Sequence, residues 1–459
     1  MSDITSNNSI SVFNMTFRRI LVFGQPFNNY SGGGITLTNL FKGWPKEKIA
    51  VTYLGHGLLN VTTDVCETYY QLGKDEHKWE FPFNLFQREF SSGIKLFEDR
   101  KDIPVNSAQK GFRHKVVNNY FYPFLRWAGL FHFTTTLSLS EKFKNWLAEF
   151  DPEIVYLQVA ARDEIVFAKD LIDHLKVPSV IHFMDDWPTT ISSRGLFKKY
   201  WSHKIDKELK SLLDKVDLHL SISDAMSEEY RKRYKKKFLP FHNPIEVGLW
   251  APYTKKDFKI DKKYVNILYS GRIGDNGIAE SVVEVASAID SMKDDGTNIK
   301  LHIQTPTKDR RIIDKLNRYK CVVFNSFAEY SQIPKIFSGA DILLLANDFS
   351  SLGLKYLRFS MPTKASEYMI SGTPVFVYTP EVAAVSQFFS KNECGYCITV
   401  QSREEIVKAI RYLINNEEYR KKISLNAVNL AKERFAAEKV RNEFQKYLVN
   451  LVNQDNHVH

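Results

Sequence analysis

The stretch FSMPTKASEYMISGTPVFVY, residues 359–378, predicts a helix that is followed directly by a buried strand. Pro362 suits the first turn of a helix, because the N–H groups of that turn have no intrahelical partner. Gly372 and the Thr-Pro pair after it end the helix, and the apolar residues VFVY continue as the strand. Two charged residues, Lys364 and Glu367, nevertheless stand early in this short helix, and their presence beside an apolar strand requires an explanation.

The same alternation of apolar strands and helices runs outward from this stretch. Apolar runs such as RRILVFG (18–24), PEIVYLQV (152–159) and ADILLLAND (340–348) are each followed by a helical pattern. Continuous apolar strands between helices indicate parallel sheets that are covered on both faces. We therefore expect an α/β protein with two doubly wound, Rossmann-like domains facing a cleft. The expected parts are an N-terminal domain over 1–243, a linker over 244–263, a C-terminal domain over 264–430 and a C-terminal helix over 431–459 that packs back on the N-terminal domain.

Length and composition agree with two large domains and limit the kinds of partner. The 459 residues are too many for one ordinary core, and 44% of them are hydrophobic, which is enough to fill two. The formal net charge of +10 indicates an anionic partner: a nucleic acid, a phosphorylated small molecule or an anionic membrane surface. The N-terminal residues lack the apolar core of a signal peptide, and no run of about 18 apolar residues occurs, so a reducing cytoplasm is the simplest setting.

The four cysteines do not form a disulfide framework in a chain of this size. Cys394 and Cys397 make a Cys-x-x-Cys pair, but neither a second pair nor nearby histidines complete a zinc site. We interpret the pair as small apolar residues beside a strand.

In doubly wound sheets, ligands bind at the carboxyl ends of the strands, so polar residues just after strands are the candidates for a site. Gly271 and Arg272 follow one expected strand, and Lys364 and Glu367 lie in a helix that starts at the same edge. Helix N-terminal amides with Arg and Lys suit a diphosphate, and a carboxylate one turn further could accept hydrogen bonds from ribose hydroxyls. Taken singly, Glu367 could serve only the helix dipole and Lys364 could be solvated, but their coincidence with Arg272 favours a nucleotide site.

Two segments of the first half are candidates for the other side of the cleft. Gly32, Gly33 and Gly34 lie in YSGGGITLTNL, a Gly-rich turn after the first strand whose amides would approach a phosphate or another ligand; a flexible turn is the alternative. The strand VIHFMDDW ends in Asp185 and Asp186, the favoured cleft-facing candidates. Capping of the following turn is an equally open role for either aspartate.

Several of these motifs together resemble retaining glycosyltransferases of the GT-B fold, specifically glycosyltransferase family four. The similar segments are SISDAMSEEY (221–230), HNPIE (242–246), YSGRI (269–273) and PTKASEYMISGTPVF (362–376), and the resemblance covers nearly the whole chain. It implies transfer of a sugar from a nucleotide sugar to an acceptor hydroxyl with retained anomeric configuration. It also implies no metal ion and no enzymic nucleophile, because basic residues and helix dipoles meet the charge of the leaving diphosphate.

The resemblance carries over to individual residues, with two departures. It assigns Arg272 to the donor diphosphate and Glu367 to the donor ribose. Asn276 stands where a lysine usually follows the arginine, and Phe359 stands where the first glutamate of a paired-glutamate motif would lie. The expected donor-binding residues are Gly33, Gly34, Gly271, Arg272, Asn276, Lys364 and Glu367, and the expected catalytic residues are Asp185, Asp186, Arg272 and Lys364.

The cation that replaces the missing lysine is not fixed by the sequence. Lys355, Arg358 and Lys364 are all candidates, and we favour Lys364 because it lies one turn before Glu367 on the helix end expected to face the phosphates. The two departures also keep open a GT-B pseudo-enzyme that binds without turnover. A nucleotide-sugar epimerase of the same fold is a second alternative.

The acceptor is expected only as a class, a hydroxyl of a glycan or of a lipid-linked molecule, with surface polysaccharide synthesis as the expected process. The segment KGFRHKVVNNYFYPFLRWAGLFHF (110–133) interleaves basic and aromatic residues and could lie on the inner face of a membrane. A packed helix with a solvated basic face is the alternative. No RNA-binding signature occurs, so nucleic acid is not an expected partner.

Overall fold

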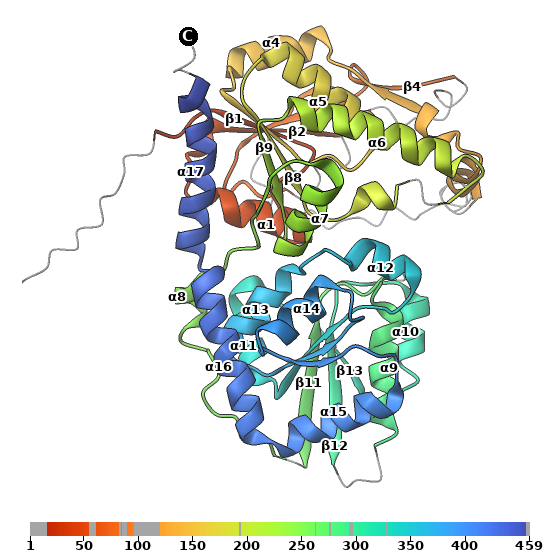
Figure 1. The fold of residues 1–459 in the computed structure, drawn as a ribbon, viewed down its shortest axis with the longest axis vertical. Coiled ribbons are helices and arrows are strands. Elements are labelled where there is room, and N and C mark those ends of the chain that lie inside the picture. The colour runs from red at the N-terminus through yellow and green to blue at the C-terminus, as the bar shows by residue number, and fades with distance from the viewer. Residues whose placement is uncertain are drawn as a thin grey trace, which may run out of the picture.

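The computed structural model describes residues 16–54, 61–81, 84, 90–95, 120–191, 194–261, 263–274, 277–292, 297–326 and 328–455. They form two domains, each built around its own sheet, which lie one above the other in Figure 1. No helix among these residues is long and apolar enough to cross a membrane. The predicted α/β fold with parallel sheets and a helical C-terminus is confirmed.

The N-terminal sheet has the strand order β10-β9-β8-β7-β1-β2-β3-β5. Strands from β10 to β3 pair in parallel, and β5 pairs antiparallel with β3. The central strands β1 and β7 are buried along their whole length, as their continuous apolar sequences predict. The strand bounds are β1 Ile20–Phe23, β2 Ile49–Leu54, β3 Thr68–Leu72, β5 Gly93–Lys95, β7 Ile154–Leu157, β8 Ser179–Phe183, β9 Leu218–Ser221 and β10 Phe238–Pro240, with β4 His77–Trp79 and β6 Thr135–Leu137 in a separate antiparallel pair.

Helices connect these strands and cover the sheet. The α-helices are α1 Gly32–Phe41, α3 Tyr122–Trp127, α4 Glu141–Phe150, α5 Arg162–Leu175, α6 Lys198–Lys215, α7 Asp224–Tyr234 and α8 Val247–Trp250. Short 3-10 helices are η1 Lys46–Lys48, η5 Phe131–Phe133 and η6 Trp187–Thr189. The expected linker over 244–263 contains α8, whose Trp250 is fully buried with its ring 5.9 Å from that of Phe337, so this part of the linker packs on the C-terminal domain.

The C-terminal sheet has the order β13-β12-β11-β14-β15-β16, with parallel pairing throughout its registered pairs. Its strands are β11 Tyr264–Ser270, β12 Asn298–Gln304, β13 Val322–Asn325, β14 Ile342–Ala346, β15 Val375–Tyr378 and β16 Tyr396–Ile398. Its helices are α9 Ala279–Asp290, α10 Arg310–Leu316, η8 Tyr330–Gln332, α11 Ile333–Gly339, α12 Ser351–Leu357, α13 Thr363–Ser371, α14 Ala384–Lys391 and α15 Arg403–Asn415.

The stretch at residues 359–378 folds as the predicted helix and strand, with one difference at its start. α13 ends at Gly372, whose φ of 73° is the left-handed conformation that favours glycine, and β15 is completely buried. Pro362 is the N-cap and not part of the first turn, because its ψ of 137° is extended. Glu367 consequently lies in the second turn, too far inside for a role at the first-turn dipole.

The end of the chain returns to the N-terminal domain. α16 (Glu417–Arg434) lies along the C-terminal domain, and α17 (Ala437–Asp455) continues upward beside α1 in Figure 1. Phe444 of α17 packs against Phe41 with ring centroids 5.2 Å apart. Arg441 of α17 also pairs with Glu246 beside α8, so α17 connects the first helix of the chain to the crossing between the domains.

Candidate functional site

The starts of two helices from different domains meet at the carboxyl edges of the two sheets. Thr363, the first residue of α13, has its Oγ1 3.5 Å from the carbonyl oxygen of Gly32, the first residue of α1. A Cβ atom at Gly32 would lie 3.2 Å from that hydroxyl, so the two backbones approach closely. Neither helix has an acidic residue in its first turn. Two positive helix ends therefore converge, and neither helix neutralises its own end with a first-turn carboxylate, which suits a diphosphate.

Lys364 points back from α13 to the end of β11. Its Nζ donates to the carbonyl oxygen of Ser270 at 3.0 Å and lies 3.8 Å from the ring centroid of Tyr269. Burial lowers the pKa of Lys364 to about 7, and the negative charge of Glu367 acts in the opposite direction. Lys364 is therefore not a freely solvated surface lysine.

Gly271 adjoins this lysine. Its φ of 135° lies in the region that favours glycine, and a Cβ atom there would lie 3.3 Å from Nζ of Lys364. Arg272 follows and is exposed, and its carbonyl oxygen accepts from the hydroxyl of Tyr269 at 2.9 Å. The end of β11 thus brings Gly271 beside Lys364, with Arg272 next in the chain. Asn276 lies outside the described residues.

Glu367 is buried one turn beyond Lys364. Burial raises its pKa to about 7, while a hydrogen bond from Tyr330 and the charge of Lys364 lower it. The two charges of this helix therefore act on one another, because each shifts the pKa of the other. Tyr330, in η8, was not anticipated, since its sequence neighbourhood carries no pattern that links it to a helix more than thirty residues later.

Phe359 occupies the contact between the domains. Its side chain packs against the hydrophobic core of the N-terminal domain, and its carbonyl oxygen accepts a hydrogen bond from Oγ of Ser223 at 2.5 Å. The guanidinium of Arg358 lies 5.1 Å from the Phe359 ring centroid. A glutamate could not be packed against that core without a cost in desolvation, so the departure at this position has a structural reason. Arg358 and Lys355 are both exposed.

The three glycines do not form the expected turn after the first strand, because all of them lie in the first turn of α1. Ser31 is the N-cap, and its side chain accepts from the amide of Gly34 at 3.1 Å. A Cβ atom at Gly34 would lie 2.1 Å from Nδ2 of Asn28, so this glycine is explained by tight packing. A Cβ atom at Gly33 would lie 3.9 Å from the side chain of Met184, which places the end of β8 beside the start of α1.

The two aspartates after β8 have different environments. Asp186 is buried, and its carboxylate accepts from Tyr230 at 2.8 Å and from both terminal nitrogens of Arg233 at 2.8 and 3.2 Å. These contacts occupy Asp186 fully and indicate that it holds the end of β8 to α7. Asp185 is exposed, and its Oδ1 accepts from the amide of Trp187 at 3.2 Å, so it matches the capping role that the sequence left open. Of the pair, Asp185 alone has a carboxylate free to face a substrate.

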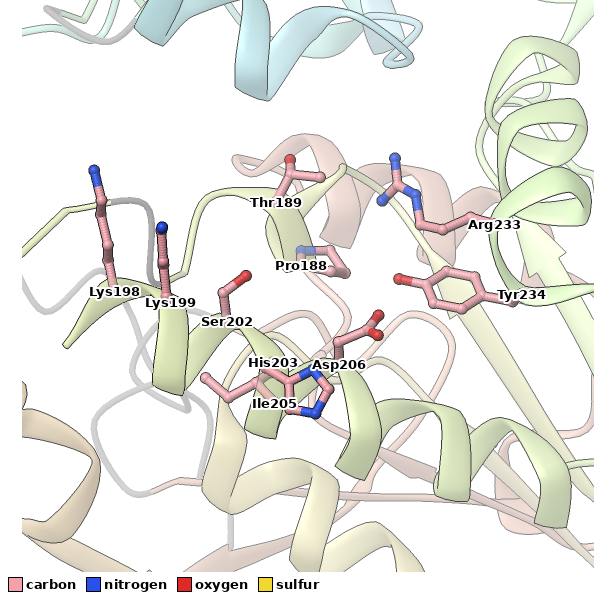
Figure 2. Close-up of a pocket in the computed structure, with 10 residues that line it drawn as sticks. All are labelled: Pro188, Thr189, Lys198, Lys199, Ser202, His203, Ile205, Asp206, Arg233 and Tyr234. Atoms are coloured by element: carbon pink, nitrogen blue, oxygen red, sulfur yellow. The ribbon is translucent and has the colours of Figure 1, made fainter.

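A pocket of about 710 Å³ opens next to these aspartates, between η6, the first half of α6 and the end of α7. It is lined by Pro188, Thr189, Lys198, Lys199, Ser202, His203, Ile205, Asp206, Arg233 and Tyr234. In Figure 2, the side chains of Lys198, Lys199, Thr189 and Arg233 all point toward the side on which a helix of the C-terminal domain is drawn. This basic pocket lies on the N-terminal side of the molecule, where the acceptor is expected.

No three His, Cys, Asp or Glu side chains in the described part of the chain gather closely enough to hold a metal ion. Cys394 is buried beside β16 and Cys397 is partly buried within it, both unpaired. Burial raises the pKa of the Cys394 thiol to about 12. The thiol is therefore neutral and unreactive, like the small apolar residue that the sequence predicts.

Residues 252–429 match the family described as glycosyl transferases group 1. The matched part contains Gly271, Arg272, Lys364 and Glu367, the predicted donor-site residues of the C-terminal domain. No curated protein matches the chain.

Solved structures match nearly the whole chain at low identity. HepE from Anabaena, in complex with UDP and glucose, is 12% identical with a TM-score of 0.60, covering 94% of this chain and 100% of that one. Sucrose-phosphate synthase from Thermosynechococcus elongatus is 13% identical with a TM-score of 0.61, covering 95% and 100%. S. aureus TarM, in complex with UDP and α-GlcNAc-glycerol among others, is 14% identical with a TM-score of 0.55, covering 95% and 100%. The chain therefore has the predicted GT-B fold.

Proposed function

We propose that this protein is a retaining glycosyltransferase of family four that moves a sugar from a nucleotide sugar to a hydroxyl of a glycan or lipid-linked acceptor. The observation that carries the proposal is the meeting of the α1 and α13 helix starts beside Lys364 and Gly271. The glycosyl transferase group 1 domain and the structural similarity to proteins solved with UDP or UDP-glucose support it. The proposed process is surface polysaccharide synthesis, on the cytoplasmic face of a membrane.

The chain's own residues would act mainly on the leaving group. As the bond between the anomeric carbon and the diphosphate breaks, negative charge grows on the phosphate oxygens. Arg272, Lys364 and the two helix N-termini would stabilise that charge. The acceptor oxygen bonds to the same carbon from the same face, and its proton leaves with the diphosphate. Glu367 would accept hydrogen bonds from the donor ribose, and Asp185 is the exposed carboxylate on the acceptor side.

A thermal-shift screen against UDP-, GDP-, ADP- and dTDP-sugars tests the proposal and identifies the donor base. We expect one class to raise the melting temperature and then to support transfer or slow hydrolysis. Binding without release of nucleoside diphosphate would instead support the pseudo-enzyme, and a changed sugar on an intact nucleotide would support the epimerase. If no nucleotide sugar stabilises the protein, the proposed donor site is wrong.

The role of Glu367 is testable by substitution. Glu367→Gln should weaken nucleoside diphosphate binding by about tenfold, because a hydrogen bond to a charged acceptor contributes more than one to a neutral amide. Binding of inorganic pyrophosphate, which has no ribose, should change little. Calorimetry with both ligands provides the measurement, and an equal effect on the two would show that Glu367 acts on the phosphates instead of the ribose.

The same arrangement supports a metal-independent reaction. Because Arg272, Lys364 and the two helix starts would meet the charge of the leaving diphosphate, we expect transfer to continue in excess EDTA at the untreated rate. Activity would be followed by release of nucleoside diphosphate, before and after chelation. Loss of activity that magnesium or manganese restores would show that a metal ion shares the charge of the leaving group.

A further inference from the structure

The N-terminal domain carries an exposed apolar surface that no described segment covers. We call it the α3–α6 surface, because it combines α3, the residues after it and the start of α6. Trp127 is 53% exposed, Leu196 is 62% exposed and Phe197 is 55% exposed, which is unusual for side chains of this size. The whole surface consists of Phe124, Trp127, Leu130, Phe133, Leu196, Phe197 and Tyr200.

The segment that contains α3 and the segment that leads into α6 are joined by hydrogen bonds and close packing. The amide of Leu196 donates to the carbonyl oxygen of Trp127 at 2.8 Å, and a Cβ atom at Gly129 would lie 3.0 Å from the Phe197 side chain. The indole of the buried Trp201 donates to the carbonyl oxygen of Gly129 at 2.7 Å. The exposed side chains therefore project from an ordered backbone and form one continuous surface.

The segments that form the α3–α6 surface carry positive charge only. Residues 120–133 and 194–204 contain no Asp or Glu, whereas they contain Arg126, Arg194, Lys198, Lys199 and Lys204. Lys198 and Lys199 are exposed and form no ion pair within the described residues. Exposed aromatic side chains with cations close to them in the chain suit the interface of a bilayer that contains anionic lipids. Leu125 is the buried residue of α3, and residues 110–119 of the predicted segment 110–133 lie outside the described residues.

The basic pocket of Figure 2 begins at the edge of this surface. Lys198 and Lys199 line the pocket, and Phe197 and Tyr200, on either side of them in the chain, belong to the α3–α6 surface. A molecule whose tail lies in a bilayer against Phe197 could therefore place a phosphate near both lysines. The same juxtaposition would serve a transferase whose acceptor is anionic and anchored in lipid.

We propose that the α3–α6 surface docks on an anionic lipid bilayer and that the adjoining basic pocket receives the phosphate-bearing head of a lipid-linked acceptor. The second part rests on the proposed transferase function, whereas the docking does not. The phosphate could belong to a lipid headgroup or to a soluble molecule, and the experiment distinguishes these two sources.

The experiment is vesicle flotation of the full chain. We expect the protein to float with vesicles of phosphatidylcholine containing one third phosphatidylglycerol and to remain unbound with phosphatidylcholine alone. The double variant Trp127→Ser, Phe197→Ser should lower the bound fraction at limiting lipid by about tenfold, because its apolar contact is lost. Tyr264→Ser, at a 63% exposed aromatic residue of the other domain, is the matched control and should float like the wild type.

Two further measurements test whether the lysine charges contribute to membrane binding and which source of phosphate the protein binds. The variant Lys198→Gln, Lys199→Gln should need more phosphatidylglycerol for the same binding, and millimolar inorganic phosphate should not release the wild type. The proposal is wrong if the wild type does not float with anionic vesicles, if both apolar and lysine variants float normally, or if inorganic phosphate alone displaces the protein. These assays contain no nucleotide sugar, so a negative result would not contradict the proposed donor site. In the same way, a negative result in the nucleotide-sugar screen would not contradict the proposed membrane docking.

Discussion

Lys364→Met should lower the rate of sugar transfer by about 100-fold, because removal of one positioned donor from a developing oxyanion typically costs that much. Methionine keeps the length and unbranched shape of the side chain, so the packing above Tyr269 should persist. Release of nucleoside diphosphate at saturating donor gives the measurement. Lys355→Met, at an exposed lysine of α12, is the matched control and should retain activity. A Lys364→Met enzyme with normal turnover would exclude this lysine from the reaction.

Asn276 gives a second test of the same lysine. If Lys364 supplies the charge that relatives place at position 276, then Asn276→Lys should partly restore activity to Lys364→Met while changing the wild type little. The two substitutions would then be non-additive in a double-mutant cycle. Simple additivity would mean that the two positions do not serve the same phosphate.

The protonation of Lys364 gives a readout that a structural role would not change. Since burial lowers the pKa of Lys364 to about 7, much of it is neutral at pH 8 in the free protein. A bound diphosphate favours the charged form and raises that pKa, so binding should take up a proton at pH 8 and weaken as the pH rises above 7. Calorimetry in buffers of different ionisation enthalpy measures this uptake. Lys364→Met should abolish it, and an unchanged uptake would assign the proton to another group.

Asp186→Asn should lower the free energy of unfolding by about 3 kcal/mol, since it removes the charge of the buried carboxylate that pairs with Arg233 and leaves that arginine only the partly exposed Glu229. The asparagine amide keeps one acceptor oxygen, so it cannot accept from both Tyr230 and the two guanidinium nitrogens as the carboxylate does. Chemical denaturation of both proteins gives the difference. Asp206→Asn is the matched control, because Asp206 lines the same pocket but pairs with Lys210 at the surface, where such a pair contributes less than about 1 kcal/mol.

The same variants separate a structural role from a catalytic one. Asp185→Asn should leave stability unchanged, and a fall in its turnover would place the exposed carboxylate at the reacting sugar. If Asp186→Asn folds as stably as the wild type but loses turnover, then Asp186 is a catalytic residue and its contacts with Arg233 and Tyr230 are secondary.

Local patterns in the sequence predicted the elements well. The helix that ends at Gly372 and the buried strand after it follow from glycine conformation and apolar continuity, which depend on neighbours in the chain. Lys364 could be linked to the strand end at Gly271 because the edges of parallel sheets gather such positions. These are properties that a short window of sequence carries.

The features that the sequence did not predict are those in which contacts join distant segments. The glycines at 32–34 begin a helix because Ser31 caps it and because Asn28 fills the space that a side chain at Gly34 would need. The Asp186 carboxylate accepts hydrogen bonds from Arg233 and Tyr230, and no spacing in the sequence predicts these contacts.

The interdomain contact shows the same limit. Phe359 is used to hold the domains together, a role that depends on how the two domains meet. Tyr330 reaches Glu367 from a short helix on another loop. Neither partner could be identified from periodicity or from the motif that surrounds Glu367.

A crystal structure of the protein with the nucleoside diphosphate that the screen identifies would test the donor site most directly. We expect the diphosphate between the starts of α1 and α13, with a phosphate oxygen about 3 Å from Nζ of Lys364 and the ribose hydroxyls on Glu367. A nucleotide bound elsewhere, such as in the pocket lined by Lys198 and Lys199, with the two helix starts unoccupied, would contradict the proposed donor site.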